Sequence, residues 1–144
     1  MYSKIVVGTD GSETAAAAVA HAARLAGEHG AELHVVTAFP APSGWIGVGA
    51  AGVGFTLDDV DRADAEMKAI LDQAAASCNG VKPQLHAVSD EPAAAIIATA
   101  EAEDADLIVV GSRGMSGAGR FLLGSVPNRI SHHAPCSVLI VKTT

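Results

Sequence analysis

The chain has 144 residues, of which 49% are hydrophobic and 17% charged, which indicates a single folded domain over residues 1–144 and excludes a disordered chain. Its formal net charge of -7 repels phosphate groups at long range, which argues against nonspecific binding to nucleic acid or to an anionic membrane surface. No apolar run is long enough to span a bilayer or to form the core of a secretory signal, and the two cysteines lack a disulfide-framework or C-x-x-C pattern, so we expect a cytoplasmic protein.

Short apolar runs alternate with longer alanine-rich or acidic segments along the chain. The runs have the length and composition of strands, and the longer segments carry helix signals, such as Gly30 as a C-terminal stop and Pro92 as a first helical residue. In chain order we expect a strand over Lys4–Gly8, a helix over Glu13–His29, a strand over Glu32–Ala38, a helix over Leu57–Cys78, a strand over Lys82–Ser89, a helix over Pro92–Asp104, a strand over Leu107–Val110, a helix over Val126–Ala134 and a strand over Val138–Val141. The alternation from Leu85 to Val88 predicts that the third strand is half-buried.

This alternation of strands and helices predicts an α/β fold with a parallel sheet that helices cover on both faces. Ligands of such sheets bind beyond the carboxyl ends of the strands. The loops that follow Gly8, Ala38 and Val110 are therefore the candidate binding loops.

The connection after the second strand is long, and its part from Ser43 to Thr56 is apolar and rich in glycine. Loops of this length are uncommon unless they are functional or disordered. Three roles stay open for this segment: it lies over a bound base, packs on a second subunit, or is mobile. Its Trp45 either stacks on adenine or packs on protein.

The segment from Gly111 to Ser125 is the most informative part of the sequence, because it combines glycines with Arg113 and Arg120 directly after the fourth strand. Glycines let backbone N–H groups surround an anion, and the next helix directs its free N–H groups and its dipole to the same place. The segment lacks the Gly-Lys-Ser/Thr ending of a Walker A loop, and it does not form a dinucleotide fingerprint at the first strand-to-helix turn. It is therefore either a phosphate site or a surface loop whose Ser125 only caps the helix.

Two stretches of the chain resemble the nucleotide-binding universal stress proteins. In one of them, Gly111-x-x-Gly114 is followed, after nine further residues, by Gly124-Ser125. The other is the opening stretch Ile5–Ser12. The resemblance extends from Lys4 to Val141. It implies an open, Rossmann-like, five-stranded parallel sheet of the adenine nucleotide alpha hydrolase-like type, with the strand order 3-2-1-4-5. It also implies an adenine nucleotide in the carboxyl-end cleft, and homodimers.

The same resemblance implies which residues contact the nucleotide. Those placed around the phosphates and the ribose are Gly111, Gly114, Gly124, Ser125 and Val126, with Arg113 at a variable position between the first two glycines. The candidates that adjoin them at the strand ends are Gly8, Thr9 and Val110. The backbone of Val35 is placed at the adenine, while its side chain is expected in the core.

Asp10 matches a family position near the ribose and, where present, a metal ion, which here would be Mg²⁺. A second interpretation makes Asp10 the N-cap of the first helix, with Glu13 three residues later completing a capping box. The two roles are compatible.

No catalytic base or histidine metal site is indicated by spacing. His132 and His133 are adjacent and face different directions on a helix, and the histidines without ligand spacing are His21, His29, His34 and His86. We therefore expect a regulatory protein that binds ATP without efficient turnover. The alternatives are a slow ATPase or phosphotransferase that uses Asp10, a protein that binds AMP or cyclic AMP, and an interaction module with an empty site.

In the implied strand order the last strand lies at an edge of the sheet, yet all of its residues from Val138 to Val141 are apolar. Edge strands normally carry charges or prolines that prevent pairing with another chain. The sequence therefore predicts a homodimer in which this strand pairs with the same strand of a second copy.

Overall fold

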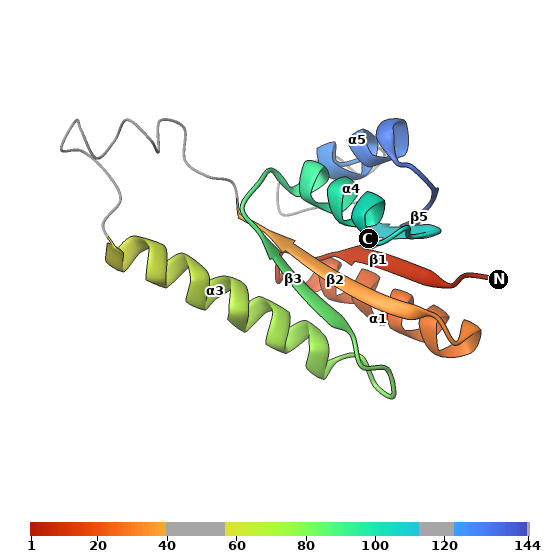
Figure 1. Ribbon diagram of the computed structural model, residues 1–144, viewed down its shortest axis with the longest axis horizontal. Coiled ribbons are helices and arrows are strands. Elements are labelled where there is room, and N and C mark those ends of the chain that lie inside the picture. Colours follow the sequence, from red (N-terminus) through yellow and green to blue (C-terminus); the bar gives the residue numbers. More distant parts are fainter. Residues whose placement is uncertain (40–56, 113–122, 144) are drawn as a thin grey trace.

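The computed structural model describes residues 1–39, 57–112 and 123–143, and in this part of the chain strands and helices alternate (Figure 1). The elements are β1 (Lys4–Gly8), α1 (Glu13–His29), β2 (Glu32–Ala38), α3 (Leu57–Ala76), β3 (Gln84–Val88), α4 (Pro92–Ala102), β4 (Leu107–Gly111), α5 (Ser125–His133) and β5 (Ser137–Val141). The strands form a five-stranded sheet in the order β3-β2-β1-β4-β5, and all neighbouring strands are parallel. The expected fold class and strand order are confirmed.

Successive residues of the central strands face opposite sides of the sheet, and each side carries its own apolar core. Val7 and Val35 are fully buried on the side that α1 and α3 cover. Val6 and Val36 are buried on the side that α4 and α5 cover. Figure 1 shows the two pairs of helices on opposite sides of the sheet. Because both faces are covered, every buried residue of β1 and β4 is apolar.

Helix and strand ends agree with the expected ends to within one or two residues. α1 ends as expected, with Gly30 in the left-handed region at φ 64° and its N–H donating to the carbonyl of Ala26. α4 ends at Ala102 rather than at Asp104, because Asp104 itself takes a left-handed conformation at φ 54° and interrupts the helix. α3 likewise stops at Ala76, before the expected end at Cys78.

The third strand is less buried than the alternation of its residues predicted. β3 lies at an edge of the sheet, and α3 covers only part of the face that carries Leu85 and Ala87. The alternation predicted one buried face, but Leu85 and Ala87 on one face are exposed, with Leu85 at 39%, and His86 and Val88 on the other face are only half-buried. An alternating pattern identifies two faces, but at an edge strand it does not decide which face is covered.

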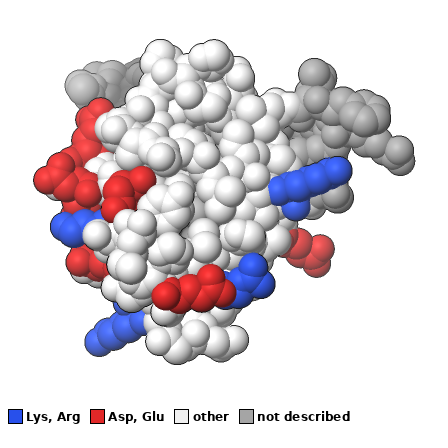
Figure 2. Space-filling view, turned by 90° about the vertical axis from the view of Figure 1, so that its right-hand side faces the viewer, with Lys and Arg blue, Asp and Glu red and all other residues white. Residues whose placement is uncertain are grey.

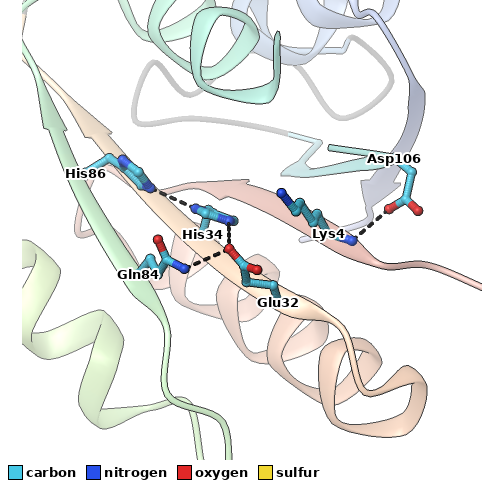
Figure 3. Close-up of polar contacts among 6 residues, drawn as sticks. All are labelled: Lys4, Glu32, His34, Gln84, His86 and Asp106. Carbon is cyan, nitrogen blue, oxygen red and sulfur yellow. Dashed lines mark hydrogen bonds and ion pairs between the residues drawn. The ribbon is translucent and has the colours of Figure 1, made fainter. Parts of the chain in front are cut away.

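The carboxylate of Asp106 joins the start of β1 to the loop that precedes β4 by hydrogen bonds (Figure 3). The two oxygens of Asp106 accept hydrogen bonds from the backbone N–H groups of Ser3 (2.8 Å) and Lys4 (3.0 Å). Burial by itself raises the pKa of Asp106, but the N–H groups of Ser3, Lys4 and Asp106 outweigh this effect, and the net pKa is below its ordinary value. The folded protein therefore favours the ionised form.

We expect Asp106→Asn to lower the free energy of unfolding by about 1 kcal/mol at neutral pH, because one N–H then meets an amide donor instead of an oxygen. A depressed carboxyl pKa stabilises the fold above the unfolded-state pKa of about 3.9, and this contribution is lost as the pH falls through the folded-state value. The difference between the two proteins should therefore shrink in acid. Urea unfolding at several pH values measures it, with the nearby exposed Asp104→Asn as control; equal stabilities at neutral pH would contradict the role of Asp106.

On the face shown in Figure 2, acidic side chains gather mainly toward the left margin, and Lys and Arg side chains are scattered, some of them beside acidic ones. This distribution agrees with the formal net charge of -7. Among the described residues, no helix is both long enough and apolar enough to cross a membrane.

Candidate functional site

A cavity of about 250 Å³ opens at the carboxyl ends of the central strands. Its position follows from the topology: β1 and β4 are neighbours, but the chain leaves them toward opposite edges of the sheet, so the loops after them diverge. The volume lies just below the range of about 300–1,000 Å³ that is usual for small-molecule sites. This cavity is the candidate site.

Most of the sequence-predicted site residues that the structure describes meet at this cavity. The lining residues among them are Gly8, Thr9 and Asp10 after β1, Val110 and Gly111 at the end of β4, and Ser125 and Val126 at the start of α5. They come from three separate stretches of the chain, which only the parallel sheet brings together.

Two predicted residues lie beside the cavity rather than in its lining. Gly124 is buried and is the N-cap of α5, and its N–H donates to the carbonyl of Ser112 at 2.9 Å. The side chain of Val35 is fully buried in the core under α1 and α3, as expected of a core residue. Its neighbour Val36 points to the other side of the sheet and lines the cavity, a contribution that sequence reasoning missed.

The other predicted features lie outside the described residues. They are Arg113, Gly114 and Arg120 of the glycine-rich segment, and the apolar loop from Ser43 to Thr56 with Trp45.

The first turn of α5 supplies backbone donors to the cavity. The first hydrogen bond within this helix runs from the N–H of Asn128 to the carbonyl of Gly124 at 3.0 Å. The N–H groups of Ser125 and Val126 have no partner among the described residues, and Pro127 has no N–H. Two free N–H groups at the positive end of a helix dipole are suited to an anion.

Asp10 lines the cavity from the turn between β1 and α1. Its Oδ1 accepts a hydrogen bond from the N–H of Ser12 at 2.9 Å, and Asp10 is exposed. Gly11 takes φ 83° in this turn, a conformation that favours glycine, and an added Cβ would lie 3.0 Å from Ile70.

The interpretation of Asp10 as the N-cap of the first helix is wrong. Ser12 is the N-cap, and its hydroxyl accepts the N–H of Ala15 at 3.2 Å. Because Asp10 lies two residues before this cap, it is bound only to the turn, and its second oxygen has no partner among the described residues. Likewise, α5 is capped by Gly124 and not by Ser125.

The remaining walls are apolar. Val36 and Ala38 line the cavity from β2, and Pro92 and Ile96 line it from α4. Gly8 allows the close approach of α4, since a Cβ added there would lie 2.3 Å from Cδ1 of Ile96. One side of the cavity is thus suited to a flat apolar group and the other to an anion.

Polar contacts outside the cavity fix the elements that line it. The N–H of Ser112 donates to the carbonyl of Val141 at 2.8 Å, and its hydroxyl accepts the N–H of Thr143 at 3.2 Å. Arg129 of α5 forms an ion pair with Glu91, the N-cap of α4. The hydrogen bond to Glu91 and its charge raise the pKa of Arg129.

Comparison with known proteins gives consistent matches over the whole chain. The model of the universal stress protein family matches residues 1–142. The universal stress protein MJ0531 of Methanocaldococcus jannaschii is 34% identical over 142 residues, which cover 99% of this chain and 83% of that protein.

Two similar solved structures are universal stress proteins in complex with an adenine nucleotide. One, in complex with cAMP, has a TM-score of 0.75, 30% identity and coverage of 99% of this chain and 98% of its own. Another, from Archaeoglobus fulgidus in complex with dAMP, has a TM-score of 0.72, 26% identity and coverage of 98% of both chains.

Proposed function

The chain belongs to the universal stress protein family, and from this premise we propose that it is a cytoplasmic regulatory protein that binds ATP in the cavity at the carboxyl ends of β1 and β4. The observation that carries the proposal is the pairing of two free N–H groups at the start of α5 with apolar walls from β2 and α4 in one cavity. The cAMP and dAMP complexes of related proteins support an adenine nucleotide as the ligand class.

The two sides of the cavity suggest how the nucleotide is divided between them. We assign the phosphates to the N–H groups of Ser125 and Val126 and to the glycine-rich segment with Gly111, Gly114 and Gly124, where Arg113 would add a positive charge. The adenine would lie against Val36, Ala38 and Ile96, next to the backbone of Val35. Thr9, Gly8 and Val110 would close the cavity between these ends.

Asp10 is assigned to the ribose and to Mg²⁺. A carboxylate with one free oxygen at the edge of a phosphate site is the kind of ligand that Mg²⁺ takes together with phosphate oxygens. In this arrangement Asp10 would bind the ion through a single oxygen, because the other is held by Ser12.

Efficient hydrolysis is not part of this proposal. Phosphoryl transfer needs a group that positions the attacking nucleophile and charges that stabilise the transferred phosphoryl group. Among the described residues that line the cavity, Asp10 is the only one with an ionisable side chain, and we assign it to the metal. Phosphate release should therefore be far slower than the rates of about 1–10³ s⁻¹ that are usual for enzymes.

The proposal is tested by identifying what the purified protein carries and what it binds. Mass spectrometry of small molecules released on denaturation should find an adenine nucleotide, and calorimetry should show binding of ATP that Asp10→Asn weakens more when Mg²⁺ is present than when it is absent. If cAMP or AMP binds more tightly than ATP, that nucleotide becomes the proposed ligand. If no adenine nucleotide binds, the proposal is refuted. Rapid phosphate release that Asp10→Ala abolishes would support the ATPase alternative.

We also propose a homodimer through β5, over Val138–Val141. β5 is an edge strand, and its Ile140 is 36% exposed. A second copy that pairs antiparallel with this edge would satisfy the outer backbone groups of both strands and cover Ile140.

A further inference from the structure

Two histidines and a glutamate converge on the sheet face under the C-terminal end of α4, and none of the three lines the nucleotide cavity. They are His34 of β2, His86 of β3 and Glu103, the C-cap of α4, and one ligand atom from each lies within 4.8 Å of the others. In the register of the sheet, His34 pairs with Gln84 and His86 pairs with Val36, so both histidines share the face that α4 covers. Figure 3 shows the two imidazole rings pointing toward one another.

A chain of hydrogen bonds orients these rings (Figure 3). Nε2 of His34 donates to Oε1 of Glu32 at 2.8 Å, and the same oxygen accepts the side-chain N–H of Gln84 at 2.7 Å. Because its Nε2 carries the proton, the neutral ring of His34 has a lone pair on Nδ1. This Nδ1 lies 2.9 Å from Nε2 of His86, and His34 is completely buried.

We propose that Nδ1 of His34, Nε2 of His86 and a carboxylate oxygen of Glu103 bind a divalent transition-metal ion, with Zn²⁺ as the first candidate. Two imidazole nitrogens and one carboxylate oxygen, with a fourth position for water, form a common Zn²⁺ ligand set. Ligand atoms at about 2.0–2.1 Å from a tetrahedral ion are about 3.3 Å apart. The two rings thus need to separate by only a few tenths of an ångström.

The surroundings of His34 are those of a metal ligand. Histidines that bind metals usually donate their other ring N–H to a carboxylate, which fixes the ring and raises its basicity. Glu32 accepts this bond, and Gln84 holds Glu32 in turn. Glu32 is therefore a positioning residue in the proposed site, not a ligand.

His86 can change its tautomer to accept a metal. Without metal its Nε2–H donates to His34, and its Nδ1 has no partner among the described residues, so the proton can move to Nδ1 when Nε2 binds the ion. Burial lowers the pKa of His86, the imidazole of His34 lowers it further and Glu103 partly opposes both. This environment favours the neutral ring, which is the form that binds metals.

A metal at this point would join three elements. β3 is an edge strand, and the ion would connect it to β2 and to α4, whose other end lines the nucleotide cavity. Since the complete ligand set exists only in the folded chain, the ion should raise the unfolding temperature.

The test uses untagged protein stripped of metal with a chelator and titrated with Co²⁺, whose visible bands report tetrahedral coordination, and then with Zn²⁺ by calorimetry. One ion should bind per chain. His86→Gln and Glu103→Gln, both at half-buried positions, should each weaken binding at least about 10-fold, and Glu32→Gln should weaken it about 10–100-fold. His34 is left unchanged because it is completely buried.

The matched control replaces His132 and His133 by Gln, since both are exposed at the end of α5. The control should bind Co²⁺ and Zn²⁺ as the unchanged protein does, and so should Asp10→Asn, which separates this site from the proposed Mg²⁺ site. Absence of binding, or equal affinity in His86→Gln and the unchanged protein, would overturn the proposal.

Discussion

Replacing Gly8 by valine is expected to weaken ATP binding by at least about 30-fold while the fold persists, a loss of about 2 kcal/mol. A Cβ at this position would lie 2.3 Å from Cδ1 of Ile96, so the Ile96 side chain must turn away. Gly8 and Ile96 both line the cavity, and the added methyl groups together with the displaced side chain would fill space that the nucleotide needs. Valine suits the end of a strand, so β1 should still form.

Calorimetry with ATP and Mg²⁺ measures the effect, and two further variants make it specific. Gly27 lies near the C-terminal end of α1 and outside the cavity lining; Gly27→Ala places a methyl group in ordinary contact with Val81 and should leave the affinity unchanged. The double variant Gly8→Val/Ile96→Ala removes the clash and should recover part of the affinity. Unchanged binding in a folded Gly8→Val protein would show that the nucleotide lies elsewhere.

The fold was predictable because its signals are local. Apolar runs of five to seven residues, a glycine after α1 and a proline at the start of α4 each determine an element without reference to the rest of the chain. The strand order came from the resemblance of Ile5–Ser12 and of the glycine spacing after β4 to a family. The burial of β3 was not predictable, since it depends on how far α3 extends over an edge strand.

The functional residues likewise differ in whether their signal in the sequence is local. Asp10 and Ser125 follow strand or loop signals, and both line the cavity, but which of Asp10 and Ser12 caps α1 depends on one turn of backbone at Gly11. His34 and His86 lie far apart in the sequence, and no spacing joins them. Only the register of β2 with β3 reveals that they share a face. The one sign of this pair in the sequence was His34, a polar residue inside the apolar run Leu33–Val36 of β2.

Ile140→Lys is expected to convert the proposed dimer into a monomer, and the structure now shows why this position is the one to change. Leu139 packs against the core beneath α1, so a charge there would disturb folding. Ile140 is 36% exposed on the edge strand. In a two-fold pairing of β5 each substitution occurs twice, and the two lysines would lie near each other across the axis.

Light scattering at micromolar concentration should give a mass of about 28.8 kDa, twice the 14.4 kDa of one chain, for the unchanged protein and about 14.4 kDa for Ile140→Lys. The matched control is Leu85→Lys, which places the same charge at a residue 39% exposed on β3, the opposite edge of the sheet. This control should keep the mass of two chains. A mass of one chain for the unchanged protein would refute the dimer, and dissociation by Leu85→Lys but not by Ile140→Lys would move the interface to β3. If the mass falls from two chains to one in Ile140→Lys alone, with an unchanged circular dichroism spectrum, the contact lies at β5, because the two variants differ only in the edge that carries the charge.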